Sequence, residues 1–199
     1  MRAHSVFRLR VGAAAPVQQT GLTCGSAVAT VARMLREDAF ATELLGPPNA
    51  PTGGAAAARF AAYEAAVHRR TNAVRSPTGR LQLPWPRALG TPPWGLAAEL
   101  TRLTGRRYRT RWVRLRPTAT RTRLAADLAR RTAPDLPAAL YVGSRWLPRH
   151  VGLLVPQDGA LVAYDPARGR VDPVGAAGWR QRRPGLLGWP VTWWVVSPR

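Results

Sequence analysis

Apolar residues in the first half of the chain recur at steps of three and four positions. Between residues 24 and 37 this spacing is carried by alanine, valine, methionine and leucine, while charged side chains fall elsewhere. The pattern is that of an amphipathic helix, and Thr23 stands at the position of a helix N-cap. The same spacing predicts three further helices, over about 55–69, 94–104 and 119–132.

Two stretches rich in proline and glycine separate the predicted helices. The first is a cluster of helix-breaking residues from Gly46 to Gly54. The second, residues 72–93, contains five prolines and predicts a long loop, either ordered or acting as a flexible lid.

The pattern changes from helical to extended in the second half. Alternating residues from Tyr108 to Leu115 indicate one strand. Short apolar runs bounded by proline, glycine and aspartate indicate four buried strands, over 138–142, 151–155, 160–164 and 191–196. Helices first and strands last predict an α+β protein, a single domain over residues 1–199. We expect an N-terminal helical half packed against a C-terminal antiparallel sheet.

The composition adds a strong positive charge to this picture. Thirty basic residues, all of them arginine, face ten acidic residues and give a net charge of +20. Arginine without lysine is typical of a GC-rich coding sequence, but the excess of basic over acidic residues still predicts attraction to polyanions. We expect this contact to be non-specific.

Several classes of protein are excluded or disfavoured by the sequence. No apolar run reaches the roughly 18–20 residues of a membrane-spanning helix, so no transmembrane segment is expected. The N-terminus lacks the apolar core of a secretion signal, which makes a cytoplasmic location the default. One cysteine and three dispersed histidines predict no disulfide, no metal site and no cofactor.

The single cysteine, Cys24, is the first candidate for chemistry. It is predicted in the first turn of a helix, where backbone N–H groups and the helix dipole stabilise a thiolate. Gly25 follows and leaves room for a substrate backbone. Gln18, six residues before Cys24, could donate a hydrogen bond to an oxyanion together with the Cys24 N–H, although the neighbouring Gln19 could supply this amide instead.

His150 and Asp165 are brought together by the geometry of a predicted hairpin. The strands that contain them flank Pro156-Gln157-Asp158-Gly159. A four-residue loop would place His150 directly opposite Asp165, and a two-residue Asp158-Gly159 turn would make them diagonal neighbours. Both registers leave the two side chains on one face of the sheet. An aspartate there can orient the imidazole and stabilise the imidazolium.

These residues resemble the signatures of papain-like cysteine peptidases, and more closely the bacterial C39-like group related to double-glycine leader peptidases. The similarity lies in the Gln-x5-Cys-Gly segment, in the histidine that opens an apolar strand, and in Tyr164-Asp165-Pro166 closing the next strand. Ser26 differs from the proline common in this group. The resemblance implies a papain-like fold with no cofactor and a peptide or protein substrate. It also implies Cys24 as nucleophile, His150 as base, Asp165 as orienting residue and Gln18 as oxyanion donor.

Four functions therefore compete. The first is a thiol hydrolase that cleaves peptide bonds, and the second is amide hydrolysis or acyl transfer on another substrate through the same residues. The third is a catalytically silent papain-like domain. The fourth is a basic module that binds nucleic acid or another polyanion through the arginine-rich region 102–131. If the chain is a hydrolase, Trp146 is expected to line the substrate site because it precedes His150.

Overall fold

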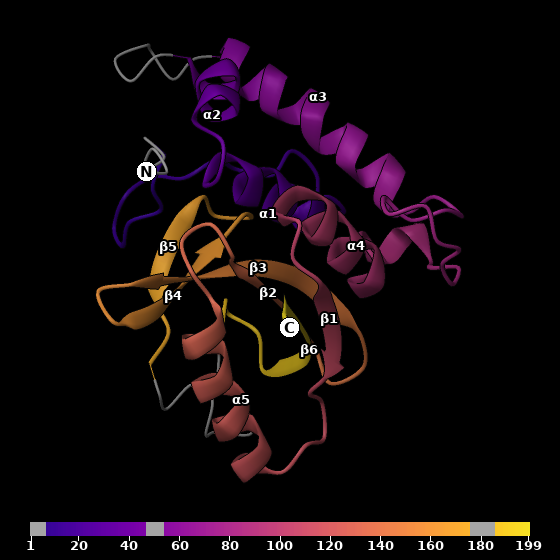
Figure 1. The fold of residues 1–199 in the computed structure, drawn as a ribbon, viewed down its shortest axis with the longest axis vertical. Coiled ribbons are helices and arrows are strands. Elements are labelled where there is room, and N and C mark those ends of the chain that lie inside the picture. The colour runs from indigo at the N-terminus through magenta and orange to yellow at the C-terminus, as the bar shows by residue number, and fades with distance from the viewer. Residues whose placement is uncertain (1–6, 47–53, 176–185) are drawn as a thin grey trace.

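One antiparallel sheet of six strands forms the centre of the protein, with helices on both of its faces (Figure 1). In the computed structural model, residues 7–46, 54–175 and 186–199 are described. The helices are α1 (Cys24–Met34), α2 (Asp38–Leu45), α3 (Gly54–Thr71), the 3-10 turn η1 (Arg87–Leu89), α4 (Pro93–Thr104) and α5 (Thr118–Arg131). The strands are β1 (Tyr108–Trp112), β2 (Ala138–Gly143), β3 (Pro148–Gln157), β4 (Ala160–Asp165), β5 (Arg170–Pro173) and β6 (Val191–Pro198).

The strand order of the sheet is β1-β6-β2-β3-β4-β5, and every neighbouring pair is antiparallel. The last strand, β6, is inserted between β1 and β2. The chain therefore returns to the middle of the sheet at its end.

The two faces of the sheet bury two separate cores, because successive side chains of a strand point to opposite sides. On β2, Ala139 and Tyr141 join the core under α1, whereas Leu140 and Val142 join the core under α5. Figure 1 shows this division, with α1, α3 and α4 on one side of the sheet and α5 on the other.

Helix α1 is the central helix of the first layer. Ten of its 11 residues are buried, and it packs against β3, α3 and α4. Most of these residues are alanine, valine, serine, threonine or glycine, so neighbouring elements can approach it closely on every side. Because these neighbours surround α1, its first residues are buried inside the protein.

The predicted α+β class and its arrangement, helices packed on a C-terminal antiparallel sheet, are confirmed. All four predicted helices and the four strands after residue 137 are present within a few residues of their expected bounds. The first helix ends at Met34 rather than at residue 37, because Glu37 is extended and α2 begins after it. Helix α2 and strand β5 were not predicted. The cluster of helix-breaking residues lies outside the described residues from position 47 to 53.

Two local predictions need correction. Thr23 precedes α1, but its side chain does not cap the helix and instead bonds with Thr20 and Glu64. The predicted strand from Tyr108 to Leu115 ends at Trp112, because the backbone of Leu115 is left-handed with a φ of 68°.

The β3–β4 hairpin adopts the shorter of the two predicted registers. Gln157 pairs with Ala160, so the turn consists of Asp158 and Gly159 alone. Both turn residues have positive φ angles, 49° and 77°, as a type I′ turn requires. His150 and Asp165 are consequently diagonal neighbours on one face of the sheet.

None of the helices among the described residues has both the length and the apolar character needed to cross a membrane.

Candidate active site

Cys24 is the first residue of α1, and its thiol is free and only 5% exposed. This position places the sulfur beside the unpaired N–H groups and the positive end of the helix dipole. The helix start is held against the sheet by the burial of α1. The nucleophile predicted from the sequence therefore has a fixed place in the fold.

His150 lies on β3 between Cys24 and Asp165. Its Nε2 atom is 2.8 Å from Oδ1 of Asp165, at the end of β4. Its imidazole also interacts with the side chain of Cys24, which helps to raise the pKa of His150. Since Nε2 is engaged by the carboxylate, Nδ1 is the ring nitrogen left for the sulfur. The structure thus brings the three predicted residues together, with His150 between Cys24 and Asp165.

The charges of this chain are coupled. Burial of His150 disfavours its positive form, but the hydrogen bonds to Asp165 and Cys24 and their negative charges outweigh burial and raise the pKa of His150 to about 9. Burial also works against the carboxylate of Asp165, yet the hydrogen bond with His150 holds the pKa of Asp165 below its ordinary value. At neutral pH the pair is therefore an imidazolium and a carboxylate.

Asp165 is positioned by more than the histidine. Its Oδ1 also accepts the backbone N–H of Ala167 at 3.0 Å, and Arg168 lies 3.8 Å from Oδ2. The side chain of Asp165 is almost fully buried. These contacts lock the carboxylate in one orientation, as an orienting residue requires.

Gln18 is tied to the same end of the sheet. Its backbone N–H donates to the carbonyl of Pro166 at 2.8 Å, and its side-chain Nε2 donates to the carbonyl of Thr20 at 2.7 Å. An amide nitrogen carries two hydrogens, so one donor is left for a substrate oxygen. Gln19 is more exposed, and its Nε2 donates to Val17.

Gly25 is buried, and the space beside it is occupied by a neighbouring loop. A Cβ atom at Gly25 would lie 2.6 Å from Cβ of Thr91. Thr91 also bonds with Ser26 through their hydroxyl groups at 3.1 Å and accepts the Tyr141 hydroxyl at 2.9 Å. Gly25 and Ser26 therefore let the end of the 72–93 loop pack on the start of α1. A substrate-binding role for Gly25 stays a prediction.

Glu64 supports the loop that leads into α1. This glutamate was not singled out from the sequence as part of the site. This residue of α3 is 1% exposed and accepts the backbone N–H of Gln19 at 3.1 Å and a hydrogen bond from Thr23. Burial raises the pKa of Glu64 despite these bonds. The available signal was its spacing, since it stands on the same helix face as Phe60 and Val67, where an apolar residue is expected.

Trp146 lies in the loop between β2 and β3 and is 67% exposed. The guanidinium of Arg145 stacks on its ring, 4.3 Å from the ring centroid. The loop leads directly into β3, the strand that carries His150. The exposed ring of Trp146 therefore lies just before the start of β3. Contact of Trp146 with a substrate remains a prediction.

The chain was compared with known families, curated proteins and solved structures. No known family matches it, and no curated protein does. Among solved structures, the crystal structure of the Pseudomonas avirulence protein AvrPphB is similar over 94% of this chain and 95% of that chain, with a TM-score of 0.46 and 13% sequence identity.

Proposed function

We propose that the protein is a papain-like cysteine hydrolase that cleaves a peptide or amide bond through Cys24, His150 and Asp165. The observation that carries the proposal is the imidazole on β3, which is hydrogen bonded to the buried carboxylate on β4 and interacts with the side chain of Cys24 at the start of α1. Within this fold, the sequence motifs resemble the C39-like group. The whole chain from residue 1 to 199 is proposed to be one such domain.

The first half of the reaction forms an acyl-enzyme. The Cys24 thiolate attacks the carbonyl carbon of the substrate, which makes a C–S bond and places a negative charge on the oxygen. The His150 imidazolium then gives its proton to the leaving nitrogen, and the C–N bond breaks. Asp165 accepts a hydrogen bond from the imidazole throughout and keeps its ring in the required orientation.

The second half releases the product. Neutral His150 takes a proton from water, whose oxygen attacks the thioester carbon. The C–S bond breaks, the carboxylic acid leaves, and the thiolate and imidazolium are restored. If an amine or alcohol attacks in place of water, the same residues perform acyl transfer, so the acceptor decides between the two reactions.

The oxyanion is stabilised by two donors in this proposal. One is the backbone N–H of Cys24 at the start of α1, and the other is the second hydrogen of Gln18 Nε2. Gln18 is favoured over Gln19 because its backbone is bonded to Pro166, next to Asp165. The Gln19 backbone is instead bonded to Glu64.

Labelling with a thiol-reactive probe tests the proposal. A biotinylated peptidyl acyloxymethyl ketone is expected to modify the folded protein at pH 7 at least tenfold faster than the urea-unfolded protein, because only the fold brings His150 to Cys24. Mass spectrometry locates the adduct, and the protein's single cysteine makes the assignment unambiguous. Equal rates for folded and unfolded protein would contradict the proposed nucleophile.

Asp165→Asn tests the orienting residue. We expect kcat/KM to fall by about 10–10³-fold, less than the roughly 10⁴-fold seen in a serine triad, because a thiol needs less help from its base. The hydrogen bond to Asp165 helps to raise the pKa of His150, so the alkaline limb of the pH–rate profile should also move to lower pH. Circular dichroism controls for folding. An unchanged rate and profile in the folded variant would remove Asp165 from the mechanism.

A further inference from the structure

The segment from Arg102 to Arg131 concentrates the positive charge of the chain. It contains 11 of the 30 basic residues and a single acidic residue, Asp127. The structure folds this segment into the end of α4, the edge strand β1 and helix α5. The catalytic proposal uses none of these residues.

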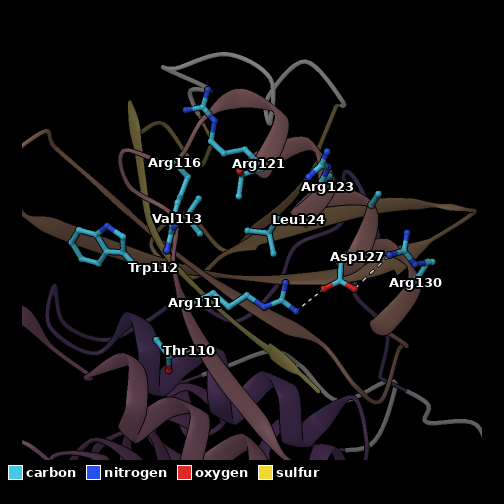
Figure 2. A pocket seen from close by; sticks show the side chains of 12 residues that line it. Thr110, Arg111, Trp112, Val113, Arg116, Arg121, Arg123, Leu124, Asp127 and Arg130 are labelled. Atoms are coloured by element: carbon cyan, nitrogen blue, oxygen red, sulfur yellow. Dashed lines mark hydrogen bonds and ion pairs between the residues drawn. The ribbon is translucent and has the colours of Figure 1, made fainter.

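A cavity of about 730 Å³ lies between β1 and α5. Figure 2 shows arginines of both elements around it, with Val113 and Leu124 between them. The volume falls within the range of about 300–1,000 Å³ that is usual for small-molecule sites. The arginines that line it are Arg111, Arg116, Arg121, Arg123 and Arg130.

Asp127 holds part of this arginine cluster in place. Its carboxylate is 2.5 Å from both Arg111 and Arg131, 3.5 Å from Arg130 and 3.7 Å from Arg109. Burial acts against the charge of this carboxylate, but these arginines hold the pKa of Asp127 below its ordinary value. Guanidinium groups fixed in advance lose less conformational entropy when a ligand binds.

One carboxylate leaves this cluster with a large surplus of positive charge. Four guanidinium groups share Asp127, and Arg116, Arg121 and Arg123 add three charges at the cavity. The Nε–H of Arg111 is also buried and has no hydrogen-bond partner among the described residues. The surplus positive charge of the arginines and the unsatisfied N–H of Arg111 both favour binding of an anion. The planar guanidinium group matches the spacing of the oxygens of a phosphate.

The cavity is separated from the thiol by the sheet. Val113 and Leu124 belong to the core beneath α5, whereas Cys24 belongs to the core of the opposite face. A ligand between β1 and α5 therefore does not contact the reacting atoms. The inference is independent of the proposed hydrolase activity.

We propose that this cavity binds a small ligand that carries two or more linked phosphate groups. Several arginines that line one cavity suit a compact polyphosphate, because each guanidinium can bind phosphate oxygens. Single-stranded nucleic acid is less well matched, because its binding sites combine positive charges with aromatic rings on which the bases stack. Trp112, the aromatic residue at the rim, packs edge-on against Trp193 and Trp194, away from the arginines in Figure 2.

Calorimetry with inorganic tripolyphosphate tests the site. In 0.15 M NaCl the full chain is expected to bind one tripolyphosphate, at least tenfold more tightly than orthophosphate. Arg116→Gln with Arg123→Gln, two exposed residues at the cavity, should weaken tripolyphosphate binding at least tenfold. The matched control, Arg69→Gln with Arg80→Gln, removes the same charge from exposed positions elsewhere and should change binding less than threefold.

A second variant covers a failure of the double variant to fold. Arg130→Gln changes a side chain that is 70% exposed, and it should weaken binding at least threefold. Equal losses in the cavity and control variants would overturn the proposal in favour of diffuse charge. Binding of a single-stranded oligonucleotide or anionic vesicles, with no binding of tripolyphosphate, would also overturn it and assign the arginines to a macromolecular surface.

Discussion

Cys24→Ala is expected to lower kcat by on the order of 10⁴-fold or more on any peptide that the wild type cleaves. The thiol is the atom that forms the acyl bond, and the described structure offers no second thiol at the site. The fold should survive, because the side chain is small and its loss leaves little empty volume beside α1. A pooled library of fluorogenic peptides supplies the substrate, and circular dichroism checks the fold.

Cys24→Ser is the matched control for shape. It keeps a hydroxyl of similar size at the helix start, but a neutral hydroxyl is a far weaker nucleophile beside the same imidazole. We expect it to fold like the wild type and to be nearly as inactive as Cys24→Ala. Substantial hydrolysis by folded Cys24→Ala would mean that another residue attacks the substrate.

His150→Ala is expected to lower kcat/KM by about 10²–10⁴-fold, the usual contribution of a general acid–base group. It also removes the imidazole hydrogen bond from the buried carboxylate of Asp165, which costs about 1–3 kcal/mol of stability. His150→Gln separates the two effects. Its amide can still donate to Asp165 but cannot exchange protons, so it should be inactive and more stable than the alanine variant. An active, folded glutamine variant would exclude His150 as the base.

The raised pKa of His150 predicts that both activity and stability depend on pH in the alkaline range. Because the imidazolium protonates the leaving group, wild-type activity should fall as the pH rises through about 9. Protonation of His150 also stabilises the fold fully below its ordinary pKa of 6.5, and that contribution is lost as the pH rises through about 9. Melting temperatures of His150→Gln should lack this alkaline loss.

The sequence was sufficient to predict the elements that carry Cys24, His150 and Asp165 because those elements are local. Cys24 opens a strongly periodic helix, and His150 and Asp165 belong to one hairpin whose two possible turns both put them on the same face. Hairpin arithmetic needs no knowledge of the rest of the fold. The order of helices before strands likewise reflects local periodicity and predicted helices packed on a sheet, but not the place of α5 on the opposite face.

Contacts between segments that are distant in the sequence could not be predicted from the periodicity of apolar residues. Glu64 holds the loop before α1 from 45 residues away, and Thr91 packs on Gly25 from the far end of a proline-rich stretch. Strand β5 has four residues, too few for alternation to stand out. Helix α2 has only eight residues and lies between the predicted first helix and the cluster of helix-breaking residues, so it was not predicted. In each case tertiary packing rather than local propensity decided the outcome.

The number of residues in the exposed turn of Asp158 and Gly159 determines whether Asp165 faces His150. Tips of surface loops ordinarily accept insertions and deletions. Here a single added residue that slipped the β3–β4 pairing by one position would reverse the face of every β4 side chain and carry Asp165 away from His150. Natural variation in this hairpin should therefore be confined to substitutions that tolerate positive φ angles, while its residue count stays constant.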